Sequence, residues 1–312
     1  MIDERVVLIT GASGFIGRYV VDCFLEDGWT VVALGDEDVP PRDGTRLFRY
    51  RIRLPSLQLG AILAAHPPNL SIHCAGASAV GPSLIDPAAD FHAGPVVTFE
   101  LLEALRRHAS QSALVFLSSA AVYGNPQSLP IRESQEVRPI SPYGFHKAQC
   151  EQLCREYSTV FGLRTASVRI FSAYGAGLRK QVLWDTCRKA LRDKTIVLNG
   201  TGKESRDFIH ARDVARALLF VVNRGCMAGE TYNLASGNET TIGELATLLT
   251  EALGVTGALI FNGVASPGVP LRWRADIGRI RALGFEPTTS LVSGIGEFAT
   301  WCASELASDS PA

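Results

Sequence analysis

The sequence lacks a long apolar run, an excess of charge of one sign and an ordered cysteine framework. No apolar segment approaches the ~20 residues of a membrane-spanning helix, so no membrane crossing is expected. The 30 lysines and arginines nearly cancel the 31 aspartates and glutamates. This balance argues against a nucleic acid or an anionic membrane as partner. Asp3 and Glu4 precede a strand-like run, unlike the start of a secretory signal.

The seven cysteines are an odd number without regular spacing. Reduced thiols and a cytoplasmic location are therefore predicted. Cys150 and Cys154 fall within one predicted helix, and no second cysteine or histidine pair stands near them. No metal site is predicted there.

The N-terminal segment has the pattern of a strand, a glycine turn and a helix, followed by a second strand at Val31–Leu34. Glycines permit a tight turn and a close approach of the backbone to a ligand, and a helix N-terminus attracts a pyrophosphate. In this context the glycine motif predicts a dinucleotide site, and a plain tight turn is the weaker alternative. The predicted cofactor-binding residues are Gly11, Ser13, Gly14, Phe15, Ile16 and Gly17.

Acidic residues at the end of the second strand bear on the choice of cofactor. Asp36 stands where a carboxylate would bond the adenosine ribose, and Glu37 and Asp38 follow it. Three acidic residues would repel an additional 2′-phosphate, so NAD is predicted over NADP. Gly35 is the alternative occupant of the strand-end position.

Strands and helices continue to alternate as far as residue 172, which predicts an α/β fold with a doubly wound parallel sheet. Cys74, Ala75 and Gly76 follow one predicted strand and are expected to pass under the cofactor, although a tight turn explains them almost as well. Residues 1–172, with a return segment near 205–235, are predicted to bind the dinucleotide. Residues 173–204 and 236–312 have a more broken pattern and are expected to form a smaller substrate-binding lobe.

Tyr143 and Lys147 lie four residues apart near the start of a predicted helix, which puts both side chains on one face. Ser141 is a good N-cap and Pro142 suits the first helical position. An ammonium beside a phenol favours the phenolate, so Tyr143 is predicted to act as a base near neutral pH. In isolation, a surface pair on an amphipathic helix would be the better interpretation.

Four motifs together resemble the extended short-chain dehydrogenase/reductases, specifically the NAD-dependent epimerase/dehydratase family that acts on nucleotide sugars. They are the glycine turn, Leu117–Gly124, Tyr143–Lys147 and Arg206–His210. The resemblance covers nearly the whole chain. It implies that Ser119 bonds a sugar oxygen, that Tyr143 transfers the proton, and that Lys147 assists Tyr143 and holds the nicotinamide ribose. It discounts the neighbouring Ser118.

The resemblance also narrows the reaction. The family's 4,6-dehydratases have an Asp-Glu pair where this chain has Ala120 and Ala121, and methyl groups cannot move protons. A nucleotide-sugar 4-epimerase that works through a transient 4-keto sugar is therefore predicted. The alternatives are a keto-sugar reductase using NAD(P)H and, less favoured, a non-catalytic dinucleotide sensor.

The substrate side departs from the family pattern. The resemblance assigns Ser172 and Arg206 to substrate binding, whereas two other clamp positions hold Ser266 and Val269 in place of arginine and aspartate. Relatives commonly dimerise through helices equivalent to those at Thr98 and Tyr143, so a homodimer is expected.

Overall fold

A seven-stranded sheet organises the molecule, with strand order β11-β6-β5-β4-β1-β2-β3. The computed structural model describes residues 5–193, 195–264, 268 and 270–308. Every neighbouring pair of strands in the sheet is parallel, which confirms the predicted doubly wound α/β fold. The strands are β1 (Val6–Thr10), β2 (Thr30–Gly35), β3 (Leu47–Arg51), β4 (Leu70–His73), β5 (Ala113–Ser119), β6 (Thr165–Ile170) and β11 (Ala228–Leu234).

Neither edge strand was predicted as a strand from its own pattern. β3 carries two arginines, and none of its five residues is fully buried. β11 lies in the return segment near 205–235, which was predicted to join the dinucleotide-binding part, and it pairs with β6. Edge strands are covered less fully than central ones, so their apolar pattern is weaker.

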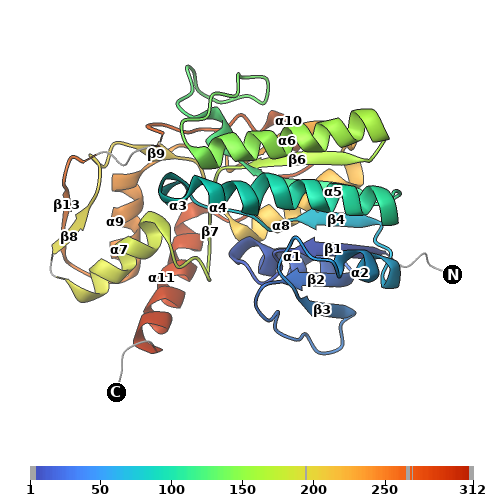
Figure 1. The fold of residues 1–312 in the computed structure, drawn as a ribbon. Helices are drawn as coiled ribbons and strands as arrows, with labels where there is room; N and C mark the ends of the chain where they lie inside the picture. The colour runs from blue at the N-terminus through green and yellow to red at the C-terminus, as the bar shows by residue number, and fades with distance from the viewer. Residues whose placement is uncertain (1–4, 194, 265–267, 269, 309–312) are drawn as a thin grey trace.

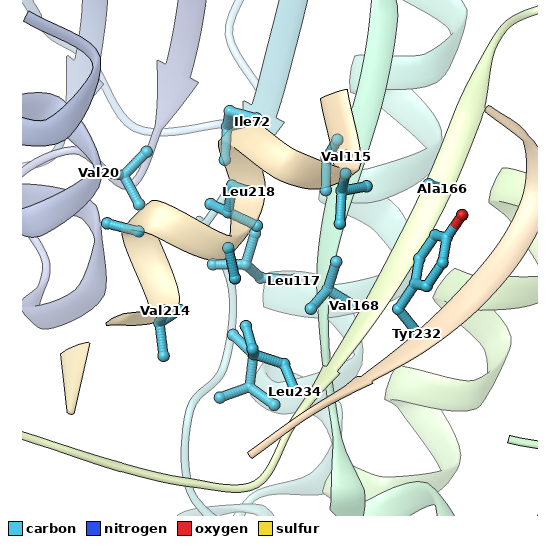
Figure 2. Packing of buried hydrophobic residues seen from close by; sticks show 14 of the residues in the cluster. Val20, Ile72, Val115, Leu117, Ala166, Val168, Val214, Leu218, Tyr232 and Leu234 are labelled. Atoms are coloured by element: carbon cyan, nitrogen blue, oxygen red, sulfur yellow. The ribbon is translucent and has the colours of Figure 1, made fainter. Parts of the chain in front are cut away.

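Side chains of successive strand residues fill two apolar layers, one on each face of the sheet. In β5, Val115 and Leu117 join one layer, and Leu114 and Phe116 join the other. Figure 2 shows Leu218 close to the strand residues Ile72 and Leu117, within the same apolar layer. The first face is covered by α1 (Phe15–Glu26), α8 (Ala211–Arg224) and α10 (Gly278–Arg281), and the second by α2 (Leu59–Ala65), α5 (Val97–His108) and α6 (Pro142–Phe161).

Short helical segments connect the sheet to these layers. They are α3 (Val80–Ile85), α4 (Pro87–Phe91), the π-helical turn η1 (His92–Val96) and the 3₁₀ turn η2 (Ala120–Tyr123). Within the described ranges, no helix has both the length and the apolar character that a membrane span requires.

A second group of elements gathers beside one end of the sheet, on the left in Figure 1. It has its own apolar cluster, in which Leu183 and Cys187 pack with Leu245, Phe298 and Cys302. A capping box formed by Thr241 and Glu244 begins one of its helices. The elements of this part are β7 (Ser172–Tyr174), α7 (Gln181–Arg192), β8 (Thr195–Leu198), β9 (Ser205–Arg206), β10 (Phe208–His210), β12 (Thr240–Thr241), α9 (Ile242–Ala252), β13 (Ala258–Phe261) and α11 (Leu291–Ser308).

The strand order reverses between β1 and β4. In open parallel sheets, ligands bind beyond the carboxyl ends of the strands at such a reversal. The glycine turn follows β1 and Cys74 follows β4, so both segments emerge at this point.

Candidate functional site

A cavity of about 1410 Å³ opens over the carboxyl ends of the central strands and extends to the second group of elements. With the exception of Ser13, every predicted site residue lines it. The predicted residues in its wall are Gly11, Gly14, Phe15, Ile16, Gly17, Asp36, Cys74, Ala75, Gly76, Ser119, Tyr143, Lys147, Ser172 and Arg206. The two clamp positions Ser266 and Val269 lie outside the described residues.

The glycine turn leaves no room for side chains. Gly11 has a φ of +65°, and a Cβ built on it would lie 2.6 Å from the backbone nitrogen of Ala75. A Cβ on Gly17 would lie 2.0 Å from the carbonyl oxygen of Gly11. Gly14 is the N-cap of α1 and has no capping side chain, so no side chain competes for the first amides of this helix. The turn therefore fits a pyrophosphate held by backbone N–H groups.

The end of β2 places one carboxylate beside this turn. Gly35 is the last strand residue, and Asp36 follows it and accepts a hydrogen bond of 3.1 Å from the Ser13 hydroxyl. Ser13 is thus tied to Asp36 and does not line the cavity itself. A carboxylate in this position suits the two hydroxyls of an unphosphorylated ribose. That this carboxylate makes the protein favour NAD over NADP stays a prediction.

The segment after β4 passes close to Lys147. Gly76 has a φ of +133°, and a Cβ on it would lie 4.0 Å from Lys147 Nζ. The backbone nitrogen of Ala75 donates to Thr10 Oγ1 at 3.2 Å, which ties this segment to β1. Burial raises the pKa of the Cys74 thiol to about 12, so Cys74 stays protonated and contributes shape rather than reactivity.

Helix α6 holds Tyr143 and Lys147 as the sequence predicts. Ser141 accepts a hydrogen bond from the backbone nitrogen of Gly144 at 3.2 Å, and Pro142 is the first helical residue. Lys147 is 8% exposed, donates to the carbonyl oxygen of Leu117 at 2.9 Å, and lies 5.9 Å from the centre of the Tyr143 ring. An ammonium has three N–H donors, so two remain for a ligand or for Tyr143.

Ser119 ends β5 and caps the turn η2. Its hydroxyl oxygen accepts a hydrogen bond of 3.2 Å from the backbone nitrogen of Ala121, which leaves its own O–H free to donate. The hydroxyl of Ser118 is buried and donates to Glu151 at 2.5 Å. Of the two serines, Ser119 alone has a hydroxyl available for a ligand.

Sequence reasoning missed a buried charged network beneath these residues. Arg169 binds the Glu151 carboxylate through two hydrogen bonds of 2.7 and 2.9 Å. Arg169 also donates to the hydroxyl of Tyr123, which in turn donates to Asn233. The signal in the sequence is the position of Glu151, four residues after Lys147 on the same helix face.

The far end of the cavity carries cationic side chains. Arg206 lies in β9, donates to the carbonyl oxygen of Ser205 at 2.6 Å, and stacks on Trp273 with 5.3 Å between guanidinium and ring centre. Burial lowers the pKa of Arg206 to about 10, against the opposing effect of Glu204, so it remains charged at neutral pH. Lys180, which the sequence did not single out, also lines the cavity, as does Ser172.

Carboxylates do not offset these two charges directly. Among the described residues, neither Arg206 nor Lys180 forms an ion pair with a carboxylate. The described ranges also contain no group of three or more histidine, cysteine or acidic side chains arranged to hold a metal ion. The far end is thus suited to an anionic ligand.

Comparisons with known proteins agree with this arrangement. The family model described as "NAD dependent epimerase/dehydratase family" matches residues 7–235. The chain is 28% identical over 306 residues to a putative UDP-glucose 4-epimerase of Methanocaldococcus jannaschii, a match that covers 95% of this chain and 98% of that protein. It is 29% identical over 332 residues to dTDP-glucose 4,6-dehydratase 1 of Escherichia coli, covering 95% of this chain and 92% of the relative.

Solved structures extend the likeness to three dimensions. MoeE5 in complex with UDP-glucose and NAD superposes with a TM-score of 0.87 at 28% identity, covering 96% of this chain and 99% of the other. The complex of MoeE5 with UDP-glucuronic acid and NAD gives a TM-score of 0.88 at the same identity and coverage.

Proposed function

Because the chain belongs to the NAD dependent epimerase/dehydratase family, it is an NAD-dependent enzyme, and we propose that it 4-epimerises a nucleotide sugar through a transient 4-keto sugar. The observation that carries this proposal is the single cavity. It joins a glycine turn fitted to a pyrophosphate, the Ser119, Tyr143 and Lys147 side chains, and the cationic Arg206. A UDP-sugar is the proposed substrate, in keeping with the ligands named for MoeE5, which are UDP-glucose and UDP-glucuronic acid.

The proposed roles follow from the free hydrogen-bonding positions. The phenolate of Tyr143 takes the proton from the sugar C4 hydroxyl, becomes the phenol, and later returns the proton to the same oxygen. The free O–H of Ser119 donates to the same oxygen and orients it. Lys147, anchored on Leu117, keeps two N–H donors for the cofactor ribose and the Tyr143 oxygen. When bound, NAD supplies the reversible acceptance and return of a hydride at C4.

The residues that follow Ser119 favour epimerisation over dehydration. Ala120 is fully buried and Ala121 is nearly so, and both belong to η2. Neither side chain can donate or accept a proton, whereas elimination of water from a sugar requires an acid and a base. We therefore expect no 4-keto-6-deoxy sugar as a product.

We propose that the two predicted domains bind the two ligands separately. Residues 1–172 and the return segment near 205–235 would bind NAD, and residues 173–204 and 236–312 would bind most of the sugar nucleotide. The apolar cluster of Leu183, Leu245 and Phe298 supports this division, whereas Ile280 and Phe285, from the second range, pack with the cluster of the sheet.

We also propose a homodimer formed through α5 and α6. Aromatic side chains on these helices stay accessible, with Phe99, Phe145 and Phe161 exposed to 44%, 53% and 49%. Exposed apolar patches on soluble chains mark interaction sites. Light scattering on the purified protein tests the dimer. A cytoplasmic location is proposed with it, since all seven cysteines are free.

The function is tested by incubating the purified protein with UDP-glucose and, separately, with UDP-glucuronic acid, in the absence of added nicotinamide cofactor, and following the products by NMR. The proposal expects the C4 epimer of at least one of these sugars to form and oxidised NAD to be released from the denatured protein at near one per chain. Turnover only when reduced cofactor is added, and only with a keto sugar, would instead identify a reductase.

A further inference from the structure

Lys180 is an unassigned cation at the rim of the cavity. It immediately precedes α7, is half-buried, and extends its ammonium to Ser78, whose hydroxyl lies 2.6 Å from Lys180 Nζ. Ser78 follows β4 and lies 102 residues away in sequence. The contact therefore joins the two sides of the cavity, and both residues line it.

The cationic side chains near Lys180 in sequence form ion pairs with carboxylates, whereas Lys180 forms none with the described residues. Lys189, on the same helix, pairs with Asp185 at 2.7 Å, and Arg179 pairs with Glu305. In the described part of the chain, Lys180 has only the hydroxyl and carbonyl oxygens of Ser78 as partners. Burial lowers the pKa of its ammonium, and no nearby carboxylate offsets this effect. A partly desolvated ammonium is stabilised far better by an anion than by a neutral hydroxyl.

The backbone beside Lys180 is also unusual. Gln181 has a φ of 67°, in the left-handed region that residues with a Cβ seldom adopt. Strained residues of this kind persist where the surrounding structure enforces them, often beside a ligand. Here the strained residue lies next to a lysine that lines the cavity, and Gln181 lines it too.

Ser78, the partner of Lys180, lies two residues after Gly76, in the segment that passes close to Lys147. Further along this segment, the hydroxyl of Ser83 accepts the backbone N–H of Tyr143 at 3.1 Å. The contact with Ser78 therefore ties Lys180 to the segment beside the proposed catalytic residues. Arg206, assigned above to substrate binding and suited to the diphosphate, is placed by a different segment and stacks on Trp273. A second cation near the reacting sugar is not needed for a neutral hexose.

We propose that the Lys180 ammonium binds an oxyanion of the sugar nucleotide, and that its source is a carboxylate on the sugar, which makes the substrate a nucleotide hexuronic acid. The inference rests on the proposed function and specifies its substrate class. In the complex, Lys180 would exchange Ser78 for the carboxylate or hold it together with the Ser78 hydroxyl. The diphosphate is the other possible source of the oxyanion.

The test uses calorimetric titration of the NAD-loaded protein with UDP-glucuronic acid and with UDP-glucose. The variants are Lys180→Met, which removes the charge, and Lys180→Arg, which keeps it. Arg188→Met is the matched control, because it removes one positive charge from the exposed face of the same helix, outside the cavity wall. Thermal unfolding and NAD content establish that each variant is folded.

For Lys180→Met, we expect binding of UDP-glucuronic acid to weaken about 10- to 100-fold, as for the loss of a hydrogen bond to a charged group. Binding of UDP-glucose should change less than about threefold, and Lys180→Arg should retain most of the affinity. An equal loss for both probes would support the oxyanion site with the diphosphate as its source.

An unchanged affinity for both probes, or a loss matched by Arg188→Met, would overturn the role of Lys180. If the wild-type protein binds and epimerises a sugar nucleotide while Lys180→Met does so equally well, only this inference fails. If the wild-type protein binds neither probe, the proposed function fails together with it.

Discussion

At the cofactor end of the cavity, glycines bring the backbone itself into the wall, whereas at the substrate end long cationic side chains line the wall. At the first end, a methyl group on Gly11 or Gly17 would overlap neighbouring backbone atoms. At the second, Arg206 and Lys180 present charged groups whose partners are carbonyl and hydroxyl oxygens. Backbone walls tolerate little change and suit one constant ligand, while side-chain walls can be altered singly to suit different ligands. We infer that, for this reason, the identity of the cofactor could be predicted from the sequence and that of the substrate could not.

The largest expected effect tests the residues between the two ends. Tyr143→Phe removes the hydroxyl that carries the proton, so turnover should fall by about 10² to 10⁴-fold while NAD content and thermal stability are retained. Tyr157→Phe is the control, since Tyr157 lies on the same helix and its hydroxyl donates to Glu103 outside the cavity. Steady-state kinetics on both variants measure the two turnover rates. Comparable turnover of Tyr143→Phe and the wild type would remove Tyr143 from the mechanism.

The next effect concerns the support beneath the site. Glu151→Leu leaves the buried Arg169 without its carboxylate, and the free energy of unfolding should fall by about 3–5 kcal/mol in urea denaturation. Glu156→Gln, at an exposed position on the same helix, should change it by less than about 0.5 kcal/mol. Adding Arg169→Met to Glu151→Leu should recover much of the loss. If Glu151→Leu is as stable as the wild type, the network does not hold this part of the fold together.

At the substrate end, the buried Asp207 is expected to make the stability of the protein depend on pH. Burial raises the pKa of Asp207 to about 6, although backbone N–H groups of Ala275, Ser236 and Gly237 oppose this rise. As the pH rises, the unfolded chain releases this proton near pH 4 and the folded chain near pH 6. The free energy of unfolding of the wild type therefore falls as the pH rises across that interval. Relative to Asp207→Asn, the wild type should lose up to about 2–3 kcal/mol between pH 4 and 6. Parallel stability curves for the two proteins would contradict the raised pKa.

The smallest effect concerns cofactor choice at the first end. Asp36→Asn removes the carboxylate beside Ser13, so the preference for NAD over NADP should fall about 10- to 100-fold. Asp43→Asn, an exposed change outside the cavity wall, should leave the preference unaltered. Calorimetry with both dinucleotides on the cofactor-free protein measures the ratio. Equal binding of NAD and NADP by the wild type would show that Asp36 does not discriminate.

Features that lie close together in sequence were the ones that could be predicted. Tyr143 and Lys147 occupy successive turns of one helix, and the glycine turn is a continuous segment, so local rules suffice to bring their atoms together. The alternation of strands and helices likewise predicted the sheet. From the sequence, only the family motif distinguished the role of Ser119 from that of Ser118. The structure gives the physical difference, because the Ser118 hydroxyl donates its hydrogen bond to Glu151.

Features that depend on distant segments could not be predicted. Lys180 meets Ser78 across 102 residues, and Trp273 supports Arg206 from another part of the chain. No periodicity or spacing in the sequence encodes such encounters. β3 escaped prediction for a different reason, since an edge strand with alternating arginines has little apolar signal.

The central claim is that the sugar is oxidised and reduced at C4 within one cavity by a cofactor that stays bound. The most direct test supplies UDP-glucose carrying deuterium at C4 and measures the label in the epimerised product by mass spectrometry and NMR. The account predicts that deuterium is retained at C4, because the hydride is removed and returned without exchange with water. Epimerised product that has lost its deuterium to solvent would contradict it.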